Sequence, residues 1–286
     1  MTNRNSLLFP AIDGTTTLYG IIGNPVAHSF SPLMHSQAFW QVGHKALYLP
    51  FPVEPEDLPQ LLEAFRIASV QGFNVTVPYK EAIVPFLDDL TEEAQLLGSV
   101  NTVWREAGRW KGHSTDGPGF VRGLKERGWQ VEGRSATLLG AGGSAKAVAF
   151  SLLKAGLAQL HIKNRTRAKA EELASKLAEI FGADRLSVGL PEGGADLLVN
   201  CTSVGLKADL SPLPKGQLEA YRQVVDIIYN PAQTRLLKDA QDLGLEWDNG
   251  LAMLLYQGVE SFEIWTGRPA PVALMKETLA AQLQGK

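Results

Sequence analysis

A glycine-rich run near the middle of the chain could bind the pyrophosphate of a dinucleotide. An apolar stretch breaks into Gly140-Ala141-Gly142 and resumes as a helix-forming run, which predicts a strand, a tight turn and a helix. The first glycine allows the turn, and the second allows the backbone to approach a phosphate beside the helix N-terminus. Glycine pairs also occur in ordinary turns, so the flanking strand and helix carry the argument. The residues expected to contact the dinucleotide are Gly140, Ala141, Gly142, Gly143, Ser144 and Ala145.

A polar cluster after the next predicted strand indicates which dinucleotide this is. Asn164, Arg165 and Thr166 stand where an NAD-binding unit usually carries an acid that binds the ribose 2′-hydroxyl. An acid would repel a 2′-phosphate, whereas Arg165 can hold one through a bidentate, charge-assisted pair. The simpler interpretations are a solvated charge for Arg165 and a helix N-cap for Thr166. The predicted cofactor is therefore NADP.

A lysine and an aspartate in the first half of the chain could move a proton beside that cofactor. Thr76, near the end of a predicted strand at residues 72–77, and Lys80, just after it, lie at the C-terminal edge where open α/β sheets bind ligands. Asp116 stands just before the chain enters the nucleotide-binding unit. Reduction of a ketone requires a proton at oxygen as hydride reaches carbon, so this pair would suit that reaction. Taken singly, Lys80 is typical of a solvated charge and Asp116 of an Asx-turn or helix cap.

Two serines precede the first predicted helix and could bind an anion. In the loop His28-Ser29-Phe30-Ser31-Pro32, Ser31 is placed as the helix N-cap and Pro32 as the first helical residue. That cap is one interpretation of the loop. The other is a carboxylate site, because two hydroxyls beside a helix N-terminus can donate to the charged group.

The composition argues against several other classes of function. The chain has 286 residues, of which 45% are hydrophobic and 20% charged, as in soluble globular proteins. A net charge of −3 gives no general attraction to nucleic acid or to anionic membranes. The single cysteine, Cys201, fits a buried core position in a cytoplasmic protein. No run approaches the length of a membrane span, no signal peptide is expected, and the histidines lack metal-ligand spacing, so no metal is predicted.

Alternating strand and helix patterns predict two α/β units. In the first half we expect strands at residues 18–23, 45–51 and 72–77, with helices at 32–42, 56–69 and 91–97 and a hairpin at 101–110. The second half has strands near residues 136, 159, 185, 197, 224 and 245, and helices near 117, 144, 167 and 232.

The last two predicted helices, residues 251–266 and 272–284, have no strands left to connect. We expect them to pack on the first unit, which makes that unit discontinuous. The predicted fold is α/β with two domains and a cleft between them, where small-molecule sites commonly lie. Residues 1–116 and 251–286 form a substrate-binding domain with a mainly parallel sheet, and residues 117–250 form a Rossmann-type NADP-binding domain.

Several ordered motifs resemble the shikimate dehydrogenase family along nearly the whole chain. The matching runs are 23–32 (GNPVAHSFSP), 74–80 (NVTVPYK), 98–102 (GSVNT), 114–117 (STDG), 140–143 (GAGG), 164–166 (NRT), 200–205 (NCTSVG), 226–231 (DIIYNP) and 250–257 (GLAMLLYQ). The resemblance implies reversible NADP-dependent reduction of 3-dehydroshikimate to shikimate, a step toward chorismate and the aromatic amino acids. Ser114 and the run Cys201-Thr-Ser203 depart from the commoner family residues, which puts only fine positioning in doubt.

The resemblance also implies roles for individual residues. Lys80 and Asp116 would be the catalytic pair, and we favour Lys80 as the proton donor because a carboxylate is ordinarily too acidic to act alone near neutral pH. Ser29, Ser31 and Tyr229 would bind the substrate carboxylate. Thr76, Asn101 and Gln257 would hold the ring hydroxyls. Beyond the glycine run, the cofactor-binding residues would be Asn164, Arg165, Thr166, Thr202, Ser203, Gly250 and Met253, although Met253 could equally be a core methionine.

Two alternatives stay open at this stage. One is a quinate/shikimate dehydrogenase of broader specificity, which must accept a further hydroxyl beside the carboxylate. The other is a non-catalytic NADP-binding regulator, which would keep the glycine run and Arg165 but would not need Lys80 with Asp116. We expect a small-molecule substrate, no nucleic-acid or membrane partner, and a monomer or homodimer.

Overall fold

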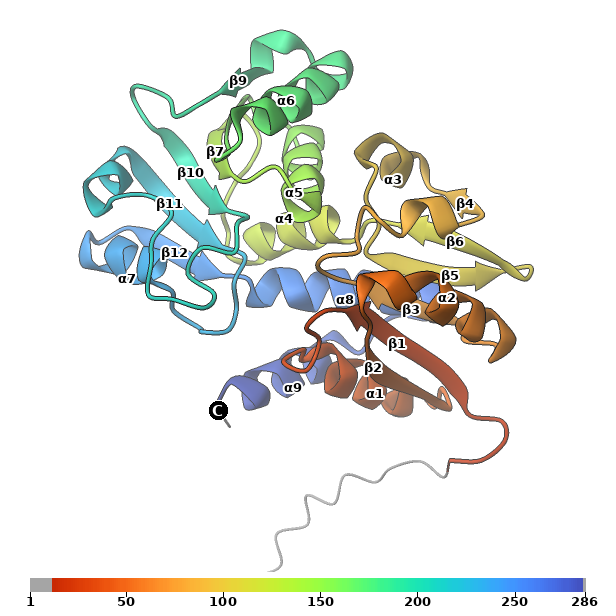
Figure 1. Cartoon of the computed structure of the whole chain (residues 1–286). Coiled ribbons are helices and arrows are strands. Elements are labelled where there is room, and N and C mark those ends of the chain that lie inside the picture. Colours follow the sequence, from red (N-terminus) through yellow and green to blue (C-terminus); the bar gives the residue numbers. More distant parts are fainter. Residues whose placement is uncertain (1–11, 285–286) are drawn as a thin grey trace, which may run out of the picture.

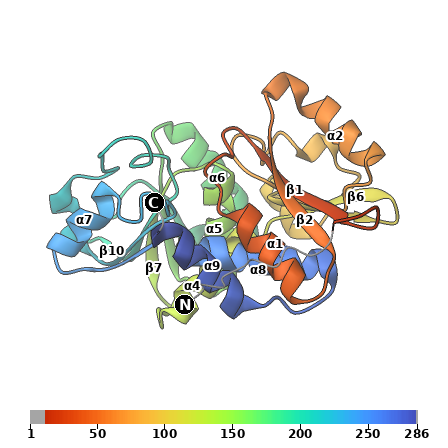
Figure 2. The same ribbon diagram turned by 90° about the horizontal axis from the view of Figure 1, so that it is seen from below.

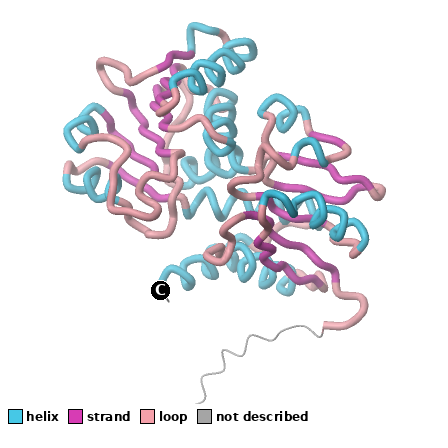
Figure 3. The backbone as a smooth tube through the Cα atoms, viewed as in Figure 1, coloured by secondary structure: helices cyan, strands magenta, loops and turns pink. Residues whose placement is uncertain are grey.

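The computed structural model describes residues 12–284, which form two six-stranded sheets with helices packed around them (Figures 1 and 3). The strands of the first sheet run in the order β2-β1-β3-β5-β6-β4. Their bounds are β1 (Thr17–Gly23), β2 (Ala46–Pro52), β3 (Gly72–Val75), β4 (Asp89–Leu90), β5 (Thr102–Glu106) and β6 (Arg109–His113). β1 is parallel to β2 and β3, whereas β5 pairs antiparallel with β3 and β6 as the predicted hairpin.

The helices of this half connect its strands. They are α1 (Ser31–Gln41), α2 (Leu58–Ile67) and α3 (Glu92–Leu97). α2 shows how the apolar spacing forms the element, because its inward positions Leu58, Leu62 and Phe65 are buried while most of its other residues are exposed. The helix is shorter at both ends than its predicted range, and residues Pro55–Asp57 form a separate 3-10 turn before it.

The second sheet is entirely parallel and has the order β12-β11-β10-β7-β8-β9. Its strands are β7 (Ser135–Leu139), β8 (Gln159–Lys163), β9 (Leu186–Val188), β10 (Ala195–Asn200), β11 (Tyr221–Asp226) and β12 (Glu246–Asn249). Its helices are α5 (Gly143–Lys154), α6 (Arg167–Phe181) and α7 (Arg235–Asp242). The strand order reverses between β7 and β10, and the crevice at such a switch point is where dinucleotides bind in this fold.

Two long helices join the halves. α4 (Asp116–Glu126) leads into the second sheet. α8 (Leu251–Thr266) leads back from that sheet to the first half and packs against α4 (Figure 1). The approach is close: a Cβ placed on Gly119 would lie 2.5 Å from the backbone nitrogen of Gln257. Glycine at this position therefore lets the two helices pack backbone to backbone.

The C-terminal helices pack beside α1. α9 (Val272–Gln284) lies next to α1 and α8 (Figure 2). Val259 and Phe262 of α8 and Met275 of α9 share one buried cluster with Met34 and Phe39 of α1. Within residues 12–284, no helix is both long and apolar enough to cross a membrane.

Candidate active site and cofactor site

Lys80 and Asp116 meet where the two halves of the molecule join. Lys80 lies on the turn after β3, and its carbonyl oxygen accepts a 2.8 Å hydrogen bond from the Val100 N–H. Its Nζ lies 2.5 Å from Oδ2 of Asp116, the first residue of α4. Only 13% of the lysine side chain and 7% of the aspartate side chain are exposed. A nearly buried ion pair interacts strongly and is poorly screened, which suits a proton-transferring pair.

Asn101 holds the aspartate of this pair in position. Its amide nitrogen donates to Asp116 Oδ1 at 2.8 Å and lies 3.3 Å from Gln257 Oε1, while its Oδ1 accepts from the Thr115 N–H at 2.7 Å. Asn101, Asp116 and Gln257 are all buried. Three predicted site residues from different segments thus form one connected group.

The glycine run of the second half contacts the lysine directly. Lys80 Nζ donates to Ser144 Oγ at 3.1 Å. A Cβ on Gly143 would lie 2.7 Å from Ser99 Oγ and 3.3 Å from Lys80 Cβ, so the backbone here rests on the residues around Lys80. Next to this contact, Lys146 Nζ pairs with Glu81 Oε1 at 2.8 Å. The first turn of α5 is therefore seated against residues 80–81.

The two serines of the first loop lie beside Tyr229, but their hydroxyls behave differently from the prediction. The expectation that Ser31 is the N-cap is wrong: α1 begins at Ser31, whose N–H donates to Ser29 Oγ at 3.2 Å. Ser31 instead hydrogen-bonds Tyr48, whose pKa burial raises well above its ordinary value. The ring of Tyr229 packs on Phe30 with centroids 5.3 Å apart. Burial raises the pKa of Tyr229, and a hydrogen bond from the Phe30 backbone limits the rise.

A buried hydrogen-bond chain links these serines to the Lys80–Asp116 pair, and the sequence analysis missed it. Tyr48 Oη donates to Asn74 Oδ1 at 2.7 Å, and Asn74 Nδ2 donates to Thr102 Oγ1 at 3.1 Å and to Ser261 Oγ at 3.0 Å. Thr102 Oγ1 donates to Asn101 Oδ1 at 3.1 Å. Asn74 and Thr102 lie inside motif runs, which is a signal that could have found them, whereas Tyr48 and Ser261 carry none.

The loop after β7 fits a dinucleotide. Gly140 has φ of 117°, a conformation that favours glycine, whereas a Cβ on Gly142 would meet no atom within 4 Å. The space beside Gly142 is therefore open to a ligand. The first N–H groups of α5 lack helical partners and can donate to a phosphate there.

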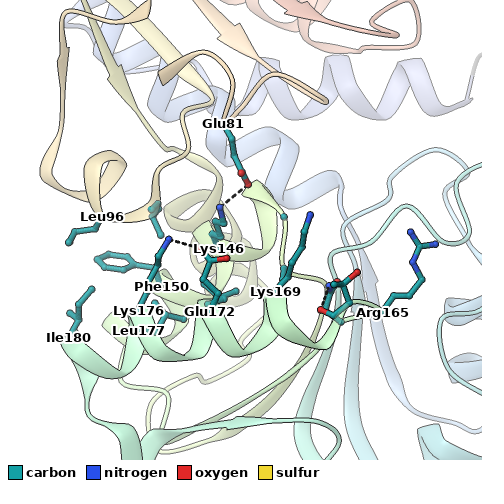
Figure 4. Close-up of a pocket in the computed structure, with 16 residues that line it drawn as sticks. Glu81, Leu96, Lys146, Phe150, Arg165, Lys169, Glu172, Lys176, Leu177 and Ile180 are labelled. Carbon is teal, nitrogen blue, oxygen red and sulfur yellow. Dashed lines mark hydrogen bonds and ion pairs between the residues drawn. The ribbon is translucent and has the colours of Figure 1, made fainter. Parts of the chain in front are cut away.

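A cavity of about 310 Å³ extends from Gly142 along α6 as far as Ile180. Asn164, Arg165 and Thr166 line it, as predicted for the 2′-phosphate end, and Lys169 lines it too (Figure 4). Thr166 precedes α6 but makes no side-chain cap hydrogen bond. Lys169 was missed, although its position one turn after Arg165 could have indicated it. The cationic side chains of Arg165 and Lys169 and the free N–H groups at the glycine loop complement the negative phosphates of NADP.

The other residues predicted for the substrate and cofactor sites lie on segments next to the glycine loop and to β3. Thr202 Oγ1 donates to Asn200 Oδ1 at 2.7 Å and accepts from the Val204 N–H, so its hydroxyl is used within the loop after β10. Gly250 is the N-cap residue that precedes α8, and a Cβ there would lie 1.9 Å from the Ile227 carbonyl oxygen. Ser203 is exposed next to Thr202, Thr76 is half-buried at the end of β3, and Met253 shares a buried cluster with Ala141 and Ala145.

Two ionisable groups with raised pKa values lie behind the site, the buried Asp226 and the half-buried Cys201. Asp226, at the end of β11, accepts hydrogen bonds from the Thr234 hydroxyl at 2.7 Å and from the Ile228 N–H at 3.0 Å, and burial raises its pKa to about 6. Burial also raises the pKa of the Cys201 thiol far above its ordinary value, which disfavours the thiolate form that a nucleophilic cysteine needs. In the described part of the chain, no group of three His, Cys, Asp or Glu side chains could hold a metal.

The fold and the site together define a two-domain, dinucleotide-dependent oxidoreductase, because a nearly buried lysine–aspartate pair touches the glycine loop of a Rossmann-type sheet. Comparison with known proteins identifies the family. Sequence profiles match residues 21–103 ("Shikimate dehydrogenase substrate binding domain"), 124–204 ("Shikimate / quinate 5-dehydrogenase") and 250–280 ("Shikimate 5'-dehydrogenase C-terminal domain"). The chain belongs to the shikimate dehydrogenase family.

Similarity to individual relatives extends over the whole chain. The chain is 43% identical to the NADP(+) shikimate dehydrogenase of Symbiobacterium thermophilum, and the comparison covers 100% of both chains. A crystal structure of a shikimate dehydrogenase in complex with NADP+ superposes with a TM-score of 0.89 at 39% identity, covering 96% of this chain and 99% of that one. The Thermus thermophilus enzyme in complex with NADP(H) and shikimate gives a TM-score of 0.84 at 40% identity, covering 93% and 100%.

Proposed function

We propose that this chain catalyses the reversible NADPH-dependent reduction of 3-dehydroshikimate to shikimate, on the route to chorismate and the aromatic amino acids. The observation that carries the proposal is the Lys80–Asp116 pair, held 2.5 Å apart and in contact with the glycine loop through Ser144. A regulator that only bound NADP would have no use for a buried proton-transfer pair at this place. The family membership independently supports an enzyme with this reaction.

NADPH, when bound, supplies the hydride. In the proposal the N–H groups at the start of α5 hold its pyrophosphate, and Arg165 with Lys169 holds its 2′-phosphate. Thr202, Ser203, Gly250 and Met253 would line the remainder of the cofactor site. A guanidinium and an ammonium at the 2′-phosphate end favour NADP over NAD, because NAD has no charge there.

Lys80 is assigned to the reacting oxygen of the substrate. Its ammonium group stabilises the negative charge that develops on this oxygen and donates a proton to it. In the reverse direction Lys80 receives the proton from the hydroxyl. Asp116 aims the ammonium, and Asn101 keeps the carboxylate of Asp116 from turning away.

The substrate carboxylate is assigned to the loop with Ser29 and Ser31 and to Tyr229. These groups gather around Phe30 and offer hydroxyl donors to an anion. Thr76, Asn101 and Gln257 are assigned to the ring hydroxyls. Asn101 and Gln257 already touch each other and Asp116, so a hydroxyl bound by them would lie next to the catalytic pair.

We place the protein in the cytoplasm as a monomer or homodimer with a small-molecule substrate as its partner. Its single cysteine, Cys201, needs no oxidising compartment. Light scattering after size-exclusion chromatography and fractionation of the source cells test the two assignments.

Enzyme assays test the proposed reaction directly. Purified protein with NADPH and 3-dehydroshikimate should consume NADPH, and shikimate with NADP should regenerate it. Quinate and NAD, measured side by side, report on the broader quinate/shikimate activity. Absence of NADPH consumption with a folded, NADPH-binding protein would show a regulator instead.

A further inference from the structure

The hydrogen bonds of the Lys80 ammonium group account for two of its three protons. One N–H points to Asp116 Oδ2 and one to Ser144 Oγ. Within residues 12–284 no third acceptor lies within hydrogen-bond distance of Nζ. An ammonium group has three donors in tetrahedral positions, so two fixed partners determine the direction of the third. That third N–H is free for an oxygen of the substrate.

Ser144 is well placed to fix this direction. It is the second residue of α5, half-buried, and its Oγ serves Lys80 as an acceptor. Gly143 beside it contacts the Lys80 side chain so closely that a Cβ would lie 3.3 Å from Lys80 Cβ. The backbone of the glycine loop thereby holds Ser144 at a set distance from the lysine.

We propose that Ser144 is a positioning residue of the reaction: its hydroxyl, together with Asp116, aims the Lys80 ammonium at the reacting oxygen of the substrate. This role goes beyond the cofactor contact expected of a residue in the glycine loop. It also couples the loop that holds the pyrophosphate to the group that moves the proton, since both depend on the first turn of α5. The kinetic part of the inference rests on the proposed reaction.

Kinetics of Ser144→Ala test the inference. Loss of a hydrogen bond to a charged group should lower kcat about tenfold, with little change in KM for 3-dehydroshikimate or NADPH. Ser144→Thr, which keeps the hydroxyl, should restore most of the rate. In a Lys80→Ala background, Ser144→Ala should cause no further loss, because the serine acts through the lysine.

A matched control lies on the same helix. Ser151 is buried on α5, and its Oγ has no hydrogen-bond partner. Ser151→Ala therefore removes a hydroxyl from α5 without touching the Lys80 contacts and should leave kcat unchanged. Glu81→Ala removes the other contact of the first turn, the pair with Lys146. If Glu81→Ala lowers kcat as Ser144→Ala does, domain seating explains the effect and the inference fails.

A second readout uses the ligand-free protein and needs no turnover. Acetylation of each lysine with acetic anhydride, read by peptide mass spectrometry, reports how firmly Lys80 is held. Lys80 should react several-fold faster in Ser144→Ala than in the wild type or Ser151→Ala, and slowly again in Ser144→Thr. An unchanged Lys80 rate, or a higher KM for NADPH at unchanged kcat, would make Ser144 a phosphate ligand only and overturn the inference. If the wild type shows no turnover but the acetylation rates change as expected, the proposed reaction fails and the Ser144 contact stands.

Discussion

At the scale of single residues, the site depends on a few charges that are held by many neutral partners. Asp116 has its two oxygens on Lys80 and Asn101, and Asn101 is in turn bonded to Thr115. The two charges are nearly buried, so removing one leaves the other without compensation. Substitutions at the charged positions should therefore change activity strongly.

Lys80→Ala should lower kcat by about 10² or more and change the KM for substrate comparatively little. The physical reason is that the ammonium acts on charge that develops only in the transition state. Steady-state kinetics measures both constants, with Lys125→Ala, an exposed lysine of α4, as the control. A rise in KM at unchanged kcat would make Lys80 a binding residue.

Arg165→Ala should weaken NADPH binding by about tenfold or more and leave NADH binding nearly unchanged, because only NADPH carries the 2′-phosphate. Titration of protein fluorescence with each nucleotide gives the two dissociation constants. Arg167 is a suitable control, since it is exposed and pairs with Glu171 on its own helix at 2.7 Å. Equal losses for both nucleotides in Arg165→Ala would contradict a 2′-phosphate role.

At the scale of elements, α1 contains a buried histidine that makes the fold sensitive to acid. His35 stacks on Tyr48 with ring centroids 4.7 Å apart, and neither of its ring nitrogens has a hydrogen-bond partner. Burial lowers its pKa from 6.5 to about 3. The folded state therefore holds the neutral ring, while the unfolded chain takes up a proton below its ordinary pKa.

The sign of the pH dependence follows from this shift. The contribution of the neutral His35 ring to the free energy of unfolding is complete above its unfolded pKa of 6.5. It is lost as the pH falls toward the folded pKa of about 3. Between pH 7 and pH 5 this one group should cost about 2 kcal/mol of unfolding free energy. His35→Leu should lose that dependence. Urea unfolding at both pH values measures it, with the exposed His28→Leu as the control; an equal pH effect in wild type and His35→Leu would exclude His35 as the cause.

At the scale of the whole molecule, α4 and α8 carry the connection between the two sheets. α4 contacts both α5 and α8, and the close approach of α4 and α8 requires a glycine at position 119. Asp116, the partner of Lys80, is the first residue of α4, so the same packing that joins the halves also positions the Lys80–Asp116 pair.

Gly119→Ala should lower the free energy of unfolding by about 1–3 kcal/mol, because its Cβ would overlap the backbone of Gln257 and force the helices apart. Gly216→Ala is the matched control, since a Cβ there would meet no atom within 4 Å. Thermal and denaturant unfolding of the two variants gives the comparison. Equal stability of both variants would show that α4 and α8 can separate at no cost.

Much of this architecture could be predicted from the sequence. Alternating apolar patterns predicted the strands and helices of both sheets to within a few residues, except the two-residue β4 (Asp89–Leu90), because local periodicity reflects which face of each element is buried. The glycine loop and the Asn164-Arg165-Thr166 cluster also follow from local geometry: a turn, a helix N-terminus and a charge at the end of a strand. Shikimate dehydrogenase was likewise indicated by short motifs read in order along the chain.

What only the tertiary structure decided is which distant side chains meet. Lys80 and Asp116 are 36 residues apart, and Lys80 and Ser144 are 64 apart. No periodicity reports such contacts, because they depend on how the two sheets are packed through α4 and α8. The hydroxyl of Ser31 illustrates the same limit: local rules made it a helix cap, but the fold brought Tyr48 against it. The sequence by itself determined the chemistry available to this protein, and the packing of its two halves decided which groups can act together.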